Sequence, residues 1–236
     1  MSAAEIRTER WETVSPDQDS WLKAGLVTGL PELRMAELFA CRPDLFQTSE
    51  FLVVATDVDG RLPLAVLGAS WQGIESGLRF LHIGLQFVVA PARGSPAFRR
   101  SWQQLLATVV GGAGEFPAIS ALKTFNPVAY CAMRAYGRLP GAVMYPELER
   151  TADPAMTGLA AQIAHALAPD HAFDSETGVI TGIGVPSDLY RVRPTCEDPV
   201  VDDYFRRQLS PGDRLLSVVH VRESRAGTDI QQRFTR

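Results

Sequence analysis

The sequence lacks long hydrophobic runs and has no excess of positive charge. Its longest apolar stretches are interrupted by Gly, Pro or charged residues, whereas a membrane helix needs about 20 apolar residues in succession. Lys and Arg total 23 against 27 Asp and Glu, which gives a formal charge of -4. Proteins that bind phosphate backbones normally carry a basic surplus. We therefore expect neither a membrane-spanning segment nor nucleic acid as a partner.

Cysteine is also scarce. The three cysteines, Cys41, Cys131 and Cys196, are odd in number and far apart. A disulfide framework needs an even number and a zinc site needs short, paired spacings, so we expect buried free thiols and no metal site. The N-terminal stretch MSAAEIRTERWETVSPDQDS is polar throughout, whereas a secretory signal requires a continuous apolar segment. The sequence thus predicts a cytoplasmic protein.

What is present has the composition of an ordinary globular protein. Hydrophobic residues make up 46% and charged residues 21% of the 236 residues, close to the usual averages. This length suits one large domain or two small ones. The first 30 residues show no sustained hydrophobic period, and we interpret them as an N-terminal arm.

The rest of residues 1–150 alternates between strand and helix patterns. Asp59-Gly60 separates two apolar runs, which is typical of a tight hairpin. Apolar residues at helical spacing from Phe98 to Val110 predict a helix that begins after Ser95-Pro96 and ends at Gly111-Gly112. The full set of expected elements is a helix over 31–43, strands over 50–71 and 78–91, the helix over 96–110, a strand over 118–125, a helix over 126–137 and a strand over 141–148.

Residues 151–236 form a second alternating pattern. We expect helices over 151–169 and 200–209, strands over 178–186 and 214–221, and a loose polar tail to residue 236. The chain is therefore assigned to the α/β class, with a core domain at 1–150 and a C-terminal α/β extension at 151–236 packed on the core. Apolar faces in such an extension must be buried on the core sheet or against a partner chain.

The connection after the third strand combines features of an anion site. It consists of Val89, Ala90, Pro91, Ala92, Arg93, Gly94, Ser95, Pro96, Ala97 and Phe98. Unpaired N–H groups and the positive end of the dipole at a helix N-terminus favour phosphate, and small residues let a ligand approach the backbone. Arg93, Gly94 and Ser95 are the candidate contacts. The alternative interpretation is that Arg93 simply solvates the start of the helix.

A second motif runs from Lys123 to Tyr130 and contains Asn126-Pro127-Val128-Ala129. Together with the order of elements in residues 51–148, the two motifs resemble the GNAT superfamily, the Gcn5-related N-acetyltransferases. The resemblance implies a mixed, twisted β-sheet flanked by helices, and acetyl-CoA or another acyl-CoA as cofactor. It also implies cofactor contacts from Phe87, Val88, Val89, Arg93, Gly94, Ser95 and Asn126. Asn126 equally suits a plain helix cap.

The resemblance further implies a direct attack of an amine on the thioester carbonyl, polarised by backbone N–H groups near Val88 and Val89. His82 is the only titratable side chain of the central strand LHIGLQFVV, and its usual pKa near 6.5 suits a general base. Family members carry a Tyr acid seven residues after the Asn, where this chain has Met133, and Tyr130 lies about one helical turn away. We therefore predict Tyr130 as the acid, with packing roles for His82 and Tyr130 as the alternative.

These features predict an acyl-CoA-dependent N-acyltransferase, acetyl being the first choice, that acts on a small-molecule amine. Two alternatives remain open. Pro96 and Phe98 replace later glycines of the loop, which favours a non-catalytic binding or scaffold protein with the same fold. The C-terminal extension instead favours an enzyme that uses another acyl-thioester, because it can cover the acceptor cleft. It can also extend the sheet and support a homodimer.

Overall fold

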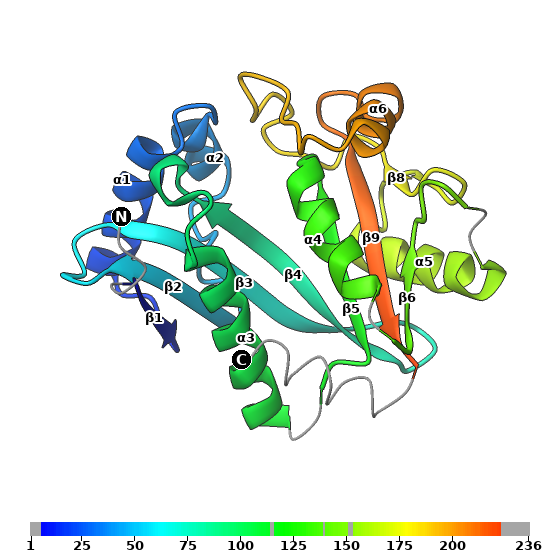
Figure 1. The fold of residues 1–236 in the computed structure, drawn as a ribbon, viewed down its shortest axis with the longest axis horizontal. Helices are drawn as coiled ribbons and strands as arrows, with labels where there is room; N and C mark the ends of the chain where they lie inside the picture. The colour runs from blue at the N-terminus through cyan, green and yellow to red at the C-terminus, as the bar shows by residue number, and fades with distance from the viewer. Residues whose placement is uncertain (1–5, 114–115, 139, 151–152, 223–236) are drawn as a thin grey trace. The chain divides into compact units, whose positions relative to one another are not determined.

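The computed structural model describes residues 6–113, 116–138, 140–150 and 153–222 (Figure 1). The predicted loose tail falls almost entirely at 223–236, outside the described residues. The chain divides into two compact units: unit 1 comprises Met1–Ser70, Ile83–Phe116 and Thr228–Arg236, and unit 2 comprises Trp71–His82 and Pro117–Gly227. The predicted boundary at residue 150 falls inside unit 2, so it does not coincide with this division.

The predicted α/β class, with sheet strands and flanking helices, is confirmed. In chain order the elements are β1 (Ile6–Trp11), α1 (Pro16–Gly29), α2 (Met35–Cys41), β2 (Phe51–Asp57), β3 (Pro63–Gly73), β4 (Arg79–Val88), the 3-10 turn η1 (Ala90–Ala92), α3 (Ala97–Ala113), β5 (Ile119–Thr124), α4 (Pro127–Gly137), β6 (Ala142–Tyr145), α5 (Pro154–Leu167), β7 (Phe173–Asp174), β8 (Val179–Ile180), α6 (Pro199–Gln208) and β9 (Arg214–Val221). Among the described residues, no helix has the length and apolar character needed to cross a membrane.

Unit 1 is built on strands in the order β1-β2-β3-β4. The pairs β1·β2 and β2·β3 are antiparallel, and α3 packs on β1 and β2. Val53 and Ala55 of β2 are fully buried, as are Leu105 and Val109 of α3. The apolar face predicted for the helix over 96–110 is therefore its packing face, which explains why this helix could be identified from spacing alone.

The predicted hairpin at Asp59-Gly60 is confirmed. Gly60 has φ 68°, a left-handed conformation that glycine adopts without steric cost. The carboxylate of Asp57 accepts hydrogen bonds from the backbone N–H groups of Arg61 at 2.7 Å and Leu62 at 3.1 Å. Asp57 thus closes the loop between β2 and β3, and this local side-chain bond holds the turn.

The predicted N-terminal arm is wrong, because the same residues form β1 and α1. Helix α1 begins with a capping box: Ser15 Oγ accepts from the N–H of Gln18 at 3.2 Å, and Gln18 Oε1 accepts from the N–H of Ser15 at 2.9 Å. Leu22 and Leu26 are its buried residues. Two apolar anchors on 14 residues give a weak period, so hydrophobic spacing missed a helix that the Ser-x-x-Gln signature indicates.

Two other predicted helices have different ends in the structure. Helix α2 begins at Met35 rather than at Pro31, with no side-chain cap. Helix α3 continues through Gly111 and Gly112 to Ala113. A Cβ at either glycine would meet nothing within 4 Å, so close packing does not require glycine at these two positions. The predicted end of the helix at Gly111-Gly112 is therefore wrong, because glycine alone does not end it.

Unit 2 is organised around β9. Strand order in this unit runs from the start of β4 through β5, β9 and β8 to β7, and β6 also pairs with β9. The pairings of β9 with β5, β6 and β8 are antiparallel. The segment between β6 and β9 carries α5, β7, β8 and α6. The predicted strand over 178–186 is reduced to β8, only two residues long, because the chain turns at Gly182, with φ 68°.

Residues after 150 pack on earlier elements of the chain within unit 2. One buried cluster joins Ile119 and Ala121 of β5 to Ile163 of α5 and to Leu216 and Val218 of β9. Its members are almost fully buried. Residues after 150 therefore contribute to the same core as β5, which is why the compact units do not separate at that position.

Replacing Ser15 by Ala should lower the free energy of unfolding by about 1 kcal/mol, because the N–H of Gln18 loses its acceptor. Urea denaturation followed by circular dichroism measures this difference. Ser76→Ala, at an exposed turn position, is the matched control and should leave the midpoint unchanged. Equal midpoints for both variants would show that the capping box does not stabilise α1.

Candidate functional site

The connection from β4 to α3 lies in unit 1 and carries the predicted loop residues. Val89 is 4% exposed, and its N–H donates to the carbonyl oxygen of Leu64 on β3 at 3.0 Å. The 3-10 turn η1 follows, and Gly94 then takes φ 75°. A Cβ at Gly94 would meet no atom within 4 Å, so the backbone here is open to a ligand and its conformation favours glycine.

Ser95 closes this turn onto the start of α3. Its Oγ donates to the carbonyl of Ala92 at 2.6 Å and accepts from the N–H of Ala97 at 3.2 Å. Pro96 has no N–H to offer. The first N–H of α3 is that of Ala97, and it is already bonded to Ser95. Ser95 is therefore a helix cap in this structure, and any anion would have to share or replace its contact with Ala97.

Arg93 has a carboxylate partner that the sequence did not indicate. Its Nη2 is paired with Oε1 of Glu32, which lies between α1 and α2. The Arg93 side chain is 53% exposed and that of Glu32 is 30% exposed. Such a partly exposed pair is weak, and it places a negative charge beside the guanidinium of Arg93. No local pattern links two residues 61 positions apart.

Asn126 begins α4, in unit 2. Its Oδ1 accepts from the N–H of Val128 at 3.0 Å, and its own N–H donates to Thr124 Oγ1 at 2.8 Å. Both bonds fix the turn from β5 into α4. The helix-cap alternative for Asn126 is thus what the structure presents, while its role in cofactor binding stays a prediction.

Tyr130 is a buried residue of α4. It is 1% exposed, its hydroxyl donates to the carbonyl of Pro146 at 3.0 Å, and its ring stacks edge-on against Phe205. Burial raises the pKa of the Tyr130 hydroxyl well above its usual value, so the group keeps its proton at neutral pH. The side chain has the geometry of a packing residue; its assignment as an acid stays a prediction.

The predicted site residues fall into two groups, one in each unit. Phe87 and Val88 end β4 in unit 1, and Val89 leads directly into the turn with Arg93, Gly94 and Ser95. His82, half-buried on the first part of β4, belongs to unit 2 with Asn126 and Tyr130. The structure therefore brings the loop residues together in one unit, and Asn126 and Tyr130 together on α4 in the other.

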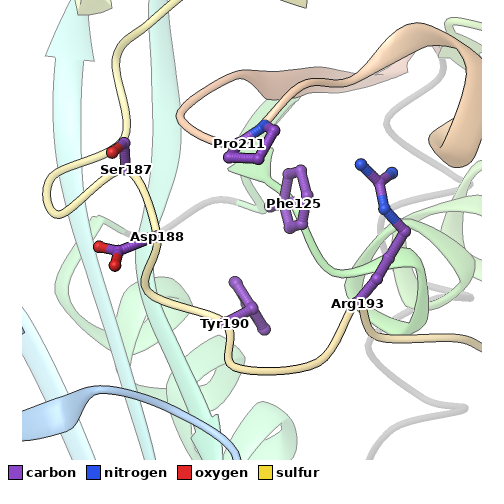
Figure 2. A pocket seen from close by; sticks show the side chains of 6 residues that line it. All are labelled: Phe125, Ser187, Asp188, Tyr190, Arg193 and Pro211. Atoms are coloured by element: carbon purple, nitrogen blue, oxygen red, sulfur yellow. The ribbon is translucent and has the colours of Figure 1, made fainter.

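A pocket of ≈ 170 Å³ adjoins Asn126 within unit 2 (Figure 2). Phe125, Ser187, Asp188, Tyr190, Arg193 and Pro211 line it. The rings of Phe125 and Tyr190 are 5.4 Å apart, and the guanidinium of Arg193 lies 4.9 Å from the centre of the Phe125 ring. The sequence motif around Asn126 includes Phe125 only as its neighbour. No sequence pattern marks the other lining residues as part of a binding site.

Arg193 is held in the wall of this pocket by backbone acceptors. Its two terminal nitrogens donate to the carbonyls of Phe205 and Leu209, each at 2.8 Å. These carbonyls belong to the last turn of α6 and the residue that follows it, and the carbonyl of Phe205 also accepts from the N–H of Leu209 at 3.2 Å. The guanidinium thus caps α6 and links it to the loop that carries Tyr190, so the pocket has an aromatic and cationic wall.

A second pocket, of ≈ 520 Å³, lies between the β3–β4 turn and α5, and no predicted site residue lines it. Its titratable lining residues are Glu75 and His165, both exposed. Across the described part of the chain, no group of three or more His, Cys, Asp or Glu residues is placed to hold a metal ion.

The chain is similar to several solved acetyltransferase structures at low sequence identity. Naa50 from Arabidopsis thaliana, with the bisubstrate analogue CoA-Ac-MVNAL, is 12% identical over 90% of this chain and 97% of its own, with a TM-score of 0.45. The GNAT acetyltransferase YhbS from Escherichia coli, with CoA, is 18% identical over 58% and 74%, with a TM-score of 0.40.

A GNAT acetyltransferase from Brucella melitensis, with acetyl-CoA, is 13% identical over 49% of this chain and 75% of its own, with a TM-score of 0.37. No protein-family model matches the chain, and no curated protein matches it either.

Replacing Tyr130 by Phe should lower the free energy of unfolding by about 1–3 kcal/mol, because the buried carbonyl of Pro146 loses its donor. Chemical denaturation measures the change. Tyr204→Phe is the matched control: its hydroxyl also donates to a carbonyl, that of Thr177, but the side chain is only half-buried, so the loss should be smaller. A Tyr130 variant as stable as the native protein would contradict the packing role.

Proposed function

We propose that this chain is an acyl-CoA-dependent N-acyltransferase that transfers an acyl group, most simply acetyl, to a small-molecule amine. The observation that carries the proposal is the β4–η1–α3 connection, in which the open, left-handed Gly94 precedes the N-terminus of a 17-residue helix. The pyrophosphate of CoA would lie at this turn, where backbone N–H groups and the helix dipole favour an anion.

The amine nitrogen attacks the thioester carbonyl, the carbonyl oxygen takes up negative charge, and the C–S bond then breaks to release CoA. A backbone N–H near the end of β4 stabilises the oxygen. Because the N–H of Val89 is bonded to Leu64, and N–H groups along a strand point alternately to its two edges, the N–H of Val88 points to the opposite edge. The N–H of Val88 is therefore the proposed donor to the carbonyl oxygen, and the N–H of Val89 is not.

The family resemblance also implies roles for two side chains of unit 2. His82 takes the proton of the attacking amine. Tyr130 returns a proton to the sulfur once its hydroxyl leaves the carbonyl of Pro146 and is exposed to the site; until then burial raises its pKa and keeps the hydroxyl protonated. Tyr130→Phe also separates the two roles of this residue: a fall in kcat at unchanged KM supports the acid, whereas an altered stability alone supports packing.

The pocket beside Asn126 is the proposed acceptor site. Its volume of ≈ 170 Å³ is below the roughly 300–1,000 Å³ of pockets that hold drug-sized ligands. This supports a small acceptor group, flanked by the rings of Phe125 and Tyr190.

A specific set of contacts favours the second candidate function, a binding protein that has lost catalysis. Arg93, Ser95 and Tyr130 each have a protein partner for the group that catalysis or cofactor binding would use. In a catalytic protein these partners must give way when acyl-CoA binds. In a scaffold they stay in place.

Acetyl-CoA should stabilise the protein against heat. At a concentration about 100 times its Kd, binding contributes about 2.7 kcal/mol, which for a chain of this size raises Tm by roughly 5–10 °C. Differential scanning fluorimetry with acetyl-CoA, longer acyl-CoAs and free pantetheine measures the shift. If none of the CoA species raises Tm at millimolar concentration, the acyltransferase proposal fails; a shift without acyl transfer to any amine supports the binding protein.

Glu32→Gln should tighten acetyl-CoA binding by a few-fold, because the neutral amide no longer competes with phosphate for Arg93. Arg93→Ala should weaken binding by a larger factor. Isothermal titration gives both Kd values. Glu37→Gln is the matched control, since Glu37 pairs with Arg34 instead, and its Kd should equal that of the native protein. A Glu32 variant that binds more weakly would overturn the competitive role of this carboxylate.

A further inference from the structure

Two of the three cysteines lie in contact with each other in unit 2. The Sγ atoms of Cys131, on α4, and Cys196, in the segment before α6, are 3.4 Å apart. Both are free thiols and half-buried, whereas Cys41 is exposed, so the thiols are free as expected, but the expectation that they are buried is wrong. A pair at this distance needs little movement to reach the roughly 2.05 Å of an S–S bond.

Contacts on either side hold the two cysteines in this arrangement. One turn along α4 from Cys131, Arg134 forms an ion pair with Asp198, and Asp198 also caps α6 through the N–H groups of Val200 and Val201. The N–H of Cys196 donates to Oδ1 of Asp202 at 2.8 Å. The segment that carries Cys196 is therefore attached to α4 and to α6 at neighbouring points, which keeps the thiols facing each other.

We propose that Cys131 and Cys196 form a reversible disulfide in the presence of a low-molecular-weight disulfide such as oxidised glutathione. The thiolate of Cys131 attacks one sulfur of glutathione disulfide, forms a mixed disulfide and releases one glutathione thiolate. The thiolate of Cys196 then attacks the sulfur of Cys131, forms the Cys131–Cys196 bond and releases the second. Both protein thiols are oxidised, glutathione disulfide is reduced, and the two thiol protons are taken up by the two glutathione molecules.

Cys131 is the first nucleophile because a cation lies next to it. Nη2 of Arg134 is 3.9 Å from its Sγ, and a neighbouring guanidinium stabilises a thiolate. Burial instead raises the pKa of the Cys196 thiol to about 12. Cys196 therefore serves as the resolving thiol, which attacks once the mixed disulfide lies beside it.

The disulfide would act on the loop that forms the acceptor pocket. Ser187, Asp188, Tyr190 and Arg193 line that pocket and precede Cys196 in one continuous segment. A covalent bond from Cys196 to α4 restricts the motion by which this segment admits a ligand. This regulatory consequence rests on the proposed function, whereas formation of the disulfide does not.

The test uses Cys41→Ser protein, which retains only the two thiols in question. After treatment with glutathione disulfide under native conditions, intact mass should fall by two hydrogen atoms without a glutathione adduct, and trypsin should yield one peptide pair joined through Cys131 and Cys196. Adding Cys196→Ser should leave a stable glutathione adduct on Cys131. Adducts on both cysteines of the Cys41→Ser protein, or a disulfide that forms only in denaturant, would overturn the proposal.

Hydrogen exchange of the same samples tests the effect on the loop. Oxidation should slow amide exchange over residues 187–198 by roughly tenfold and leave α1 unchanged, and dithiothreitol should reverse it. Unchanged exchange in the loop of the oxidised protein would overturn the regulatory part. Neither measurement depends on acetyl-CoA, so their failure is distinct from a failure of the acyltransferase proposal.

Discussion

Strand β9 is the element on which unit 2 depends. It forms antiparallel pairs with β5 over six residue positions, with β6 over four and with β8 over two, so three strands are joined through one. Leu215, Leu216, Val218 and Val219 of β9 are fully buried. A single strand thus supplies both the hydrogen-bond partners of three strands and the apolar side chains of the core, and α4 and α5 contact it.

Most of the elements that could be predicted from the sequence contain their own turn or cap residues. The β2–β3 hairpin, α3 and α4 each contain their own turn or cap residues, such as Gly60 and Asn126, and a short window of sequence is enough to identify them. Strand β1 and helix α1 were missed because β1 is a mostly exposed edge strand and α1 has few buried residues. The place of β9 could not be predicted, since strand pairing across the chain leaves no local pattern.

The candidate site shows the same limit. The sequence indicated the loop at 93–95 and the Asn126 motif, because both are contiguous. It did not indicate Glu32 opposite Arg93, the carbonyl of Pro146 opposite Tyr130, or the carbonyl of Leu64 opposite Val89. These partners come from 16 to 61 residues away, and they change what each candidate residue is free to do. The type of a residue indicates which chemistry its side chain or backbone can perform. The group that it is bonded to in the fold determines whether it is free to perform that chemistry.

The long separation between β5 and β9 has a consequence for synthesis of the protein in the cell. Ile119 pairs with His220 and Thr124 with Leu215, so β5 leaves the ribosome roughly 100 residues before its partner, a delay of about 5–20 s at usual rates of translation. During that interval the edges of β5 and β6 that pair with β9 lack their partner strand, and such edges invite aggregation. The nascent chain would therefore need protection, as from a chaperone, until its last strand has emerged.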